Sequence, residues 1–273
     1  MDKERYTQQV ERLHTRRGFE QDTCELLRRA AAQQESEETF TMNRKLKIII
    51  AVCVCALLLT GTVYAAAALL SPSDVSSHFG DSTLAKAFQS EDAVIVYETI
   101  QTGEFTITFM GMVSGKSISE DISNIDTAYT YAVVAIAYTD GREIDILDGC
   151  PVSITPLISG YAPWHINLFA LSNGASGMVQ DNVYYYLFCC SSLEPFADHD
   201  VALYVYDGFA PSSEIFSFDP VSGEVGYNDS YSGIRAVFDI PLDPSKADPA
   251  AARDIIEAAG FALNENGRLI IEE

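Results

Sequence analysis

The sequence predicts a mainly β protein with one membrane-spanning helix, and two observations carry this prediction. The run Ile48–Leu70 contains no charged residue, and at about 1.5 Å per residue it is long enough to cross a hydrocarbon core of roughly 30 Å. Beyond residue 92, short runs rich in Val, Ile, Thr and Tyr alternate with clusters of Gly, Pro, Asn and Asp, a pattern typical of short strands and turns. Many short strands and few helices favour an antiparallel β-sandwich of the immunoglobulin-like (Ig-like) class.

These signals divide the chain into five segments. In chain order they are a cytosolic helical segment with a linker (1–43), a basic stop and transmembrane helix (44–70), a spacer (71–92) with a helical turn over Ser82–Phe88, the extracytoplasmic β-sandwich (93–240), and a C-terminal helix and hairpin (241–273).

Charge is distributed unevenly along the 273 residues, whose formal net charge is -22. The first 47 residues hold ten of the 17 basic and nine of the 39 acidic residues, so the remainder carries seven basic against 30 acidic ones. Nucleic acid and anionic lipid bind proteins through clustered Lys and Arg. We therefore expect no nucleic-acid partner and a soluble, acidic domain.

The charges beside the apolar run predict its orientation. Arg44, Lys45 and Lys47 precede the run, and Asp74 follows it, so the positive-inside rule places the N-terminus in the cytoplasm and the C-terminal domain outside the cell, with lipid contact through one helix. A cleaved signal peptide is the competing interpretation, because Ala65–Ala68 would suit a signal peptidase. More than forty residues precede the run, which is longer than a typical signal-peptide n-region.

The cytosolic segment carries an apolar stripe at helical spacing. Its members are Tyr6, Val10, Leu13, Phe19, Leu26 and Leu27. Helices this short are marginal in water when isolated, so the stripe predicts contact with a cytosolic partner.

The outer domain shows strand patterns from residue 93 onward. We expect strands at Ala93–Thr99, Glu104–Val113, Ala128–Thr139, Arg142–Leu147, Val152–Ile158, Ile166–Leu171, Val183–Cys190, Val201–Tyr206 and Ile234–Ile240. Ala128–Thr139 is apolar on both faces, which is typical of a central strand. Asp140-Gly141 predicts a tight turn after it.

The C-terminal segment predicts a helix and a hairpin. Asp248 suits an N-cap, Pro249 the first helical position and Gly260 the C-terminal cap. Asn266-Gly267 predicts the hairpin turn that follows.

No pattern in the sequence indicates catalysis, so we expect no enzyme, no cofactor and no metal site. The four histidines lack neighbouring Cys, Asp or Glu residues at ligand spacing. The acidic group around Asp140 and Asp145 does not have the spacing of a calcium-binding EF-hand loop, and the acidic group around Glu224 is expected in an exposed loop. Cys150, Cys189 and Cys190 are expected as buried thiols, with a Cys150 bridge to either of the other two as the alternative.

Tyr161 and Trp164 are the candidate ligand-binding residues of the outer domain. Exposed aromatic rings on a β-sandwich can stack on sugars or anchor a partner. The alternative is that these rings belong to the core or to cross-strand pairs.

The chain resembles a family of membrane-anchored, anti-sigma-factor-like proteins of clostridial Gram-positive bacteria. The likeness lies in three places: the segment Tyr6–Arg29 with its Leu-Leu-Arg-Arg ending, the basic stop before Ile48–Ala68, and the stretch from Ala87–Ala93 to Val113–Lys116. The resemblance implies a cytosolic segment that holds a sigma factor and an outer β domain for an unknown ligand. Zinc-binding anti-sigma domains carry a His with a CxxC, and here Cys24 stands alone, so no zinc is implied.

Two function classes remain open. The first is a signalling regulator whose outer domain senses a ligand or protein and whose cytosolic stripe binds a transcription partner. The second is a membrane-anchored cell-surface binding or structural module without cytosolic signalling. The stripe distinguishes them, because a purely anchoring segment would not need it.

Overall fold

The computed structural model describes residues 69–115, 128–144, 150–264, 267 and 269–270. By contacts, the chain divides into two units, Met1–Val52 and Cys53–Glu273, and every described residue belongs to the second. The expected cytosolic segment and nearly all of the expected transmembrane run lie outside the described residues. Within the described ranges, no helix is long and apolar enough to cross a bilayer.

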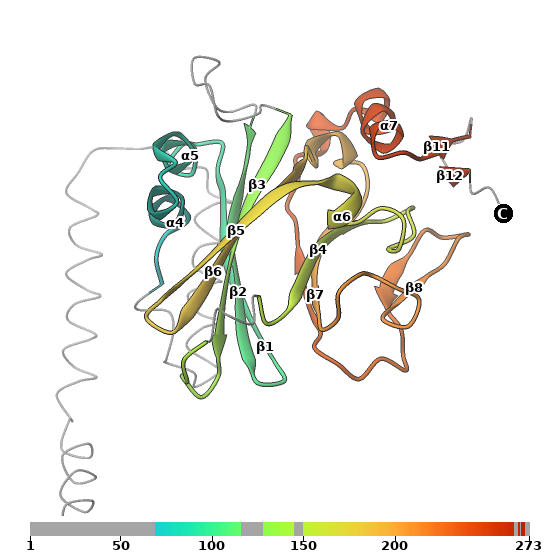
Figure 1. The fold of residues 1–273 in the computed structure, drawn as a ribbon. Coiled ribbons are helices and arrows are strands. Elements are labelled where there is room, and N and C mark those ends of the chain that lie inside the picture. Colours follow the sequence, from blue (N-terminus) through green and yellow to red (C-terminus); the bar gives the residue numbers. More distant parts are fainter. Residues whose placement is uncertain (1–68, 116–127, 145–149, 265–266, 268, 271–273) are drawn as a thin grey trace, which may run out of the picture. The chain divides into compact units, whose positions relative to one another are not determined.

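The described part is mainly β, and all of its paired strands are antiparallel (Figure 1). A five-stranded sheet has the order β1-β2-β3-β6-β5, and a three-stranded sheet has the order β10-β7-β4. Their strands are β1 (Val94–Thr102), β2 (Phe105–Ser114), β3 (Tyr129–Tyr138), β4 (Ser153–Ile158), β5 (Ser172–Gln180), β6 (Val183–Ser191), β7 (Val201–Tyr206) and β10 (Ala236–Asp239). The mainly β, antiparallel prediction is confirmed.

Strand β3 is the centre of the five-stranded sheet, as its two apolar faces predict. It pairs with β2 on one side, where Phe105 lies opposite Tyr138, and with β6 on the other. The rings of Phe105 and Tyr138 stack with centroids 4.8 Å apart. Gly111 sits at a register shift in β2, where an added Cβ would lie 2.5 Å from the carbonyl oxygen of Val94. Only glycine allows β1 to approach this closely.

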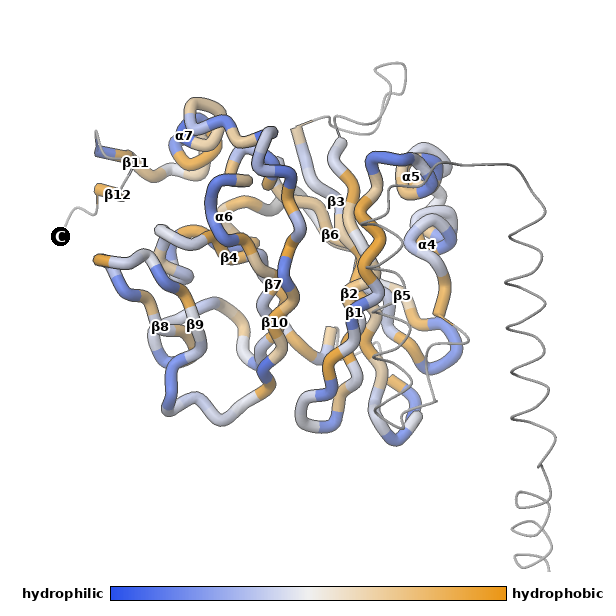
Figure 2. The backbone as a smooth tube through the Cα atoms, turned by 180° about the vertical axis from the view of Figure 1, so that it is seen from behind, coloured by the Kyte–Doolittle hydropathy of each residue, from blue (hydrophilic) through white to orange (hydrophobic). Residues whose placement is uncertain are grey.

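The two sheets share one apolar core. Ile136 of the five-stranded sheet and Leu203 of the three-stranded sheet are both fully buried in it. Phe109 and Phe238 meet across it, with ring centroids 6.1 Å apart. Figure 2 shows the hydrophobic stretches concentrated in the strands and the hydrophilic ones at turns. Burial of apolar side chains between the two sheets is the main contribution to the stability of the fold, at about 25 cal/mol per Å² of apolar surface.

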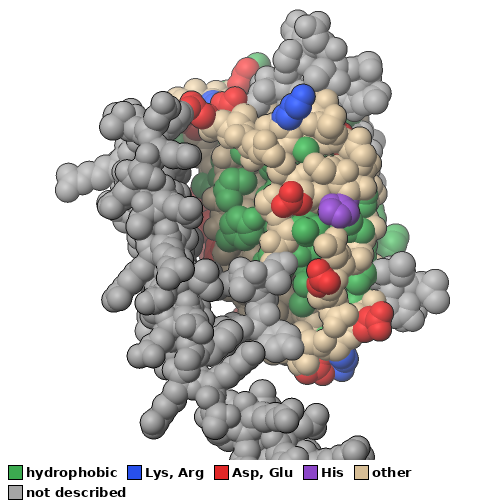
Figure 3. Space-filling view, turned by 90° about the vertical axis from the view of Figure 1, so that its left-hand side faces the viewer, with side chains coloured by type: hydrophobic (Ala, Val, Ile, Leu, Met, Phe, Trp, Pro, Cys, Tyr) green, Lys and Arg blue, Asp and Glu red, His purple; other side chains and the backbone are tan. Residues whose placement is uncertain are grey.

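Two helices cover the opposite face of the five-stranded sheet. They are α4 (Pro72–His78) and α5 (Ser82–Ala87). Leu84 and Phe88 pack there against Val133 of β3. Figure 3 shows the side of the molecule on which α4 and α5 lie, where apolar side chains gather beside acidic ones.

Of these two helices, α5 matches the turn predicted at Ser82–Phe88, whereas α4 was not predicted within the expected spacer. Its signal is a capping box, in which Ser71 and Asp74 exchange hydrogen bonds between side chain and backbone.

The strand expected at Ile166–Leu171 is wrong, because helix α6 (Leu168–Leu171) occupies its second half. Asn167 starts this helix, since its side-chain oxygen accepts from the backbone N–H of Phe169 at 2.9 Å. An apolar run this short fits either a strand or a buried helix. The true strand, β5, follows it and was missed because its Gly- and Ser-rich sequence has low strand propensity.

The strand expected at Arg142–Leu147 is also not formed over 142–144, and residues 145–147 lie outside the described ranges. The predicted turn is present, with Gly141 at φ +75° and its N–H donating to the carbonyl of Tyr138 at 2.9 Å. Strand β3 already pairs with β2 and β6, so no edge remains for a hairpin partner. Arg142 instead lies over the Tyr138 ring, 3.7 Å from its centroid.

The C-terminal segment matches the prediction. Helix α7 (Pro249–Ala258) is capped by Asp248, and the short strands β11 (Ala262–Leu263) and β12 (Leu269–Ile270) form an antiparallel pair. Ile256 of α7 is fully buried in the core shared by the two sheets.

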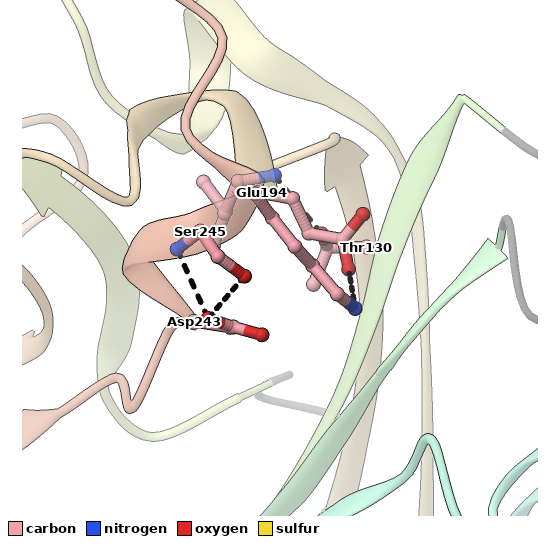
Figure 4. A network of polar contacts seen from close by, with 6 residues as sticks. Thr130, Glu194, Asp243 and Ser245 are labelled. Atoms are coloured by element: carbon pink, nitrogen blue, oxygen red, sulfur yellow. Dashed lines mark hydrogen bonds and ion pairs between the residues drawn. The ribbon is translucent and has the colours of Figure 1, made fainter.

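Polar contacts hold the segment that leads into α7 (Figure 4). Lys246 in the 3-10 turn η4 (Pro244–Lys246) is 2.6 Å from the carboxylate of Glu194 in the turn η3 (Glu194–Phe196). The backbone N–H of Leu193, which precedes η3, donates to the hydroxyl of Thr130 on β3 at 3.0 Å. These contacts connect the C-terminal segment to the centre of the five-stranded sheet.

Candidate ligand-binding groove

The outer face of the three-stranded sheet is only partly covered. A hairpin of β8 (Phe216–Phe218) and β9 (Val225–Tyr227), which was not predicted, packs on it. Tyr204 of β7 lies edge-on to the Phe216 ring, with centroids 5.7 Å apart. The hydroxyl of Tyr227 reaches the carbonyl oxygens of Val205 and Ala236 at 2.6 and 2.9 Å. The hairpin is therefore fixed to the sheet by ring packing and by hydrogen bonds.

A groove of about 710 Å³ occupies the uncovered remainder of this face. Its floor is formed by outward-facing residues of β4 and β7, among them Leu157, Ala202 and Tyr204. One wall is the end of β10 and the segment after it, residues 239–242, and the other is residues 222–225 of the hairpin. Its volume lies within the range of about 300–1,000 Å³ typical of small-molecule sites.

Three carboxylates line the groove, from Asp200, Glu224 and Asp239. None of them forms an ion pair with a Lys or Arg of the described ranges. Burial raises the pKa of Tyr204, and the charges of Asp239 and Glu224 raise it further. Both carboxylates therefore act on the same hydroxyl in the groove floor, and the groove carries a negative potential.

A smaller pocket of about 360 Å³ adjoins the groove. Its wall contains the rings of Tyr161, His165, His199 and Phe218. The groove and the pocket share three lining residues, His199, Ser222 and Gly223. They are therefore neighbouring parts of one surface depression, acidic at one end and aromatic at the other.

Close contact between two loops shapes this boundary. The N–H of Gly160 donates to the carbonyl of Gly223 at 2.8 Å, and Gly223 has φ +79°. A Cβ added at Gly223 would lie 3.0 Å from the backbone of Gly160. His199 is held beside these loops, with Nδ1 2.8 Å from the carbonyl oxygen of Ser159.

The two predicted ligand-binding residues lie differently. Tyr161 is 6% exposed, lines the aromatic pocket, and meets the edge of Phe196 with centroids 6.2 Å apart. Burial raises the pKa of its hydroxyl. Trp164 is 38% exposed and lies edge-on to Phe218, with centroids 6.4 Å apart. Trp164 thus stands beside a wall residue of the pocket, and the ligand-binding role of both residues stays a prediction.

The partner-binding stripe predicted in the cytosolic segment lies outside the described residues. Its members, Tyr6, Val10, Leu13, Phe19, Leu26 and Leu27, remain candidates from the sequence alone.

Burial shifts the pKa of two cysteines and one histidine of the described part. Cys150 and Cys190 are free thiols, and burial raises the pKa of Cys150 to about 11 and that of Cys190 further still. Both are therefore protonated at neutral pH. Burial lowers the pKa of His165. Over the described ranges, no group of three or more His, Cys, Asp or Glu residues could hold a metal ion.

The groove carboxylates were missed by reasoning from sequence. Asp200 precedes β7, Glu224 precedes β9, and Asp239 ends β10, so only the fold brings them together. Glu224 was noted, but as part of an exposed loop. No local spacing connects the three residues.

Comparison with protein-family models, with curated proteins and with solved structures finds no match to this chain.

Proposed function

We propose that this chain is a single-pass membrane regulator that resembles anti-sigma factors, with a β-rich sensing domain outside the cell. The observation that carries the proposal is the depression formed by the acidic groove and the aromatic pocket. A domain with only an anchoring or spacing role has no need for a depression of this size whose carboxylates have no Lys or Arg partner among the described residues. The N-terminal stripe supplies the cytosolic half of the proposal.

The topology is inferred from the charges around the apolar run. Arg44, Lys45 and Lys47 favour a cytosolic N-terminus, and the acidic remainder of the chain suits the outside of the cell membrane. This arrangement puts the groove on the ligand side and the stripe on the sigma-factor side.

We infer an Ig-like sandwich for the outer domain. Constant-type Ig domains have strands ABED in one sheet and CFG in the other. The order β2-β3-β6-β5 corresponds to ABED, and β4-β7-β10 corresponds to CFG. Strand β1 is then an addition at the A edge. This correspondence supports the inference, under which the groove lies on the outer face of the CFG sheet.

The test is recovery of cytosolic partners from membranes that contain the full chain. Leu26→Ala with Leu27→Ala removes two apolar side chains, each of which contributes roughly 1.5–3 kcal/mol when fully buried. Recovery of a sigma factor should fall at least about tenfold, since about 1.4 kcal/mol is one factor of ten.

Arg16→Ala with Arg17→Ala is the matched control in the same segment. Exposed ion pairs contribute only about 0–1 kcal/mol, so this variant should retain most of the partner. Equal recovery by the leucine variant and the wild type would exclude the regulator and favour a cell-surface binding module.

A further inference from the structure

We infer that the ligand of the groove is a cationic peptide segment, an extended chain with Lys or Arg side chains. This inference rests on the proposed function, in which the groove is the site where the outer domain binds its ligand. It adds the chemical class of that ligand. The argument depends on charge complementarity, on the position of the carboxylates, and on the aromatic pocket beside them.

The first step is charge. Asp200, Glu224 and Asp239 line one cavity and have no Lys or Arg partner within the described ranges. The chain beyond Lys47 carries seven basic against 30 acidic residues. Carboxylates gathered in a cleft concentrate the electric field and attract ligands of opposite charge. Phosphorylated, acidic and nucleic-acid ligands are repelled by the same charges.

The second step is the placement of two carboxylates across the groove. Strand β7 lies between β10 and β4 in the sheet. Asp239 ends β10, on one side of β7. Glu224 belongs to the hairpin, whose Gly223 is hydrogen-bonded to Gly160 just after β4, on the other side. A ligand in the groove therefore meets negative charge at both walls.

The third step is the floor between these walls. Leu157, Ala202 and Tyr204 line it and belong to the apolar cluster that the sheet forms with the hairpin. A peptide strand can lie along this floor and also place charges at both walls, because its successive side chains point in opposite directions. A single inorganic cation would leave most of the 710 Å³ unfilled.

The fourth step is the aromatic pocket. Tyr161, His199 and Phe218 offer ring surfaces within a volume of about 360 Å³. Aromatic rings attract guanidinium and ammonium groups and also pack against apolar side chains. The pocket therefore accepts one side chain of the same peptide at the end of the groove.

Trp164 provides a direct measurement of binding. It is the only tryptophan in the chain, and it touches Phe218 of the pocket wall. The full chain in detergent micelles would be titrated with hexalysine, hexaglutamate and an uncharged Gly-Ser hexapeptide while Trp164 fluorescence is recorded. Hexalysine alone should change the fluorescence and saturate, and raising the salt concentration should weaken its binding.

The variant Glu224→Gln with Asp239→Asn removes two charges from the groove. It should weaken hexalysine binding about tenfold. The control Glu214→Gln with Asp229→Asn removes the same charge from two exposed positions that do not line the groove. This control should bind within about twofold of the wild type, because only the groove charges contact the peptide.

The outcomes separate this inference from the proposed function. Equal weakening by both double variants would mean that hexalysine senses only overall charge, and that result would overturn the inference. If only the uncharged peptide binds, and Ala202→Phe in the groove floor abolishes that binding, the groove is still a binding site. This result would overturn the inference that its ligand is cationic. The partner-recovery experiment with Leu26 and Leu27 is independent of peptide charge, so its failure alone would overturn the regulator proposal.

Discussion

The two faces of the three-stranded sheet differ although the same strands build both. On β7, Leu203 and Val205 point inward and are fully buried, whereas Ala202 and Tyr204 point outward. The inner face meets a second sheet along its length, and the outer face meets only a hairpin. Alternating side chains along one strand thus assign one face to the core and the other to the groove. Changes on the inner face should affect folding, and changes on the outer face should affect the groove.

The largest expected effect tests this division within one strand. Leu203→Asp buries a charge without a partner, which costs several kcal/mol, comparable with a total stability of about 5–15 kcal/mol. The β-rich part should fail to fold. Ala202→Asp changes the adjacent, outward-facing position and should leave the fold intact. Circular dichroism and Trp164 fluorescence of the two full-length variants would check this, and equal unfolding of both would contradict the division.

A second comparison uses neighbouring residues of β10. Phe238 is fully buried against Phe109, whereas Val237 is half-buried on the outer face. Phe238→Ala should lower the free energy of unfolding by about 3–5 kcal/mol, because it leaves a cavity in a packed core. Val237→Ala should lower the free energy of unfolding by only about 1 kcal/mol, because Val237 lies on the outer face, where no second sheet packs against it. Urea unfolding followed by Trp164 fluorescence measures both values.

A third prediction concerns how the hairpin is fixed to the outer face. Tyr227→Phe removes the hydroxyl that reaches Val205 and Ala236 and that accepts from the N–H of Ala236 at 3.1 Å. The variant should be about 1–3 kcal/mol less stable, because the backbone groups of Val205 and Ala236 lose their hydrogen-bond partner. Tyr204→Phe breaks one hydrogen bond, to the carbonyl of Val225, and should cost less. The reverse order in thermal unfolding would show that the hairpin is held elsewhere.

The difference between the faces also explains what the sequence could predict. Strands β2 and β3 were predicted because they carry long apolar patterns that a buried sheet requires. Strand β5 and the β8–β9 hairpin were missed, because Gly, Ser and short aromatic runs gain their conformation from tertiary contacts. The apolar run before β5 was misread because a run this short fits either a strand or a buried helix, and the local cap at Asn167 starts a helix.

The candidate site was less predictable than the fold. Tyr161 was predicted as a ligand-binding residue because aromatic residues near turns are often exposed. In the structure its ring is buried and forms part of a pocket wall. Asp239 gave no signal, since a single acidic residue at a strand end usually faces solvent. Residues of β10, β7 and the hairpin come together only because strands far apart in the sequence pair with one another. Local sequence patterns do not show which strands pair.

The smallest expected effect concerns how the charge of Asp239 at the groove lowers stability through its repulsion of Glu98. Glu98 on β1 has its pKa raised, first by burial and then by the charge of Asp239. Its folded-state pKa therefore lies above the ordinary value of 4.5, so the folded state holds this proton more tightly than the unfolded state. The linked contribution to stability is lost as the pH rises through that window.

Glu98→Gln removes this charge and should stabilise the full chain at pH 7 by less than about 1 kcal/mol, because solvent screens a partly exposed group. The advantage should shrink as the pH falls toward 4, where Glu98 of the wild type becomes protonated in the folded state. Urea unfolding at both pH values measures it. Glu214→Gln, at an exposed position two residues before strand β8, is the control that removes the same charge elsewhere. An advantage of Glu98→Gln that is equal at pH 4 and pH 7 would mean that packing, and not the burial of the Glu98 charge or its repulsion from Asp239, sets the stability at this position.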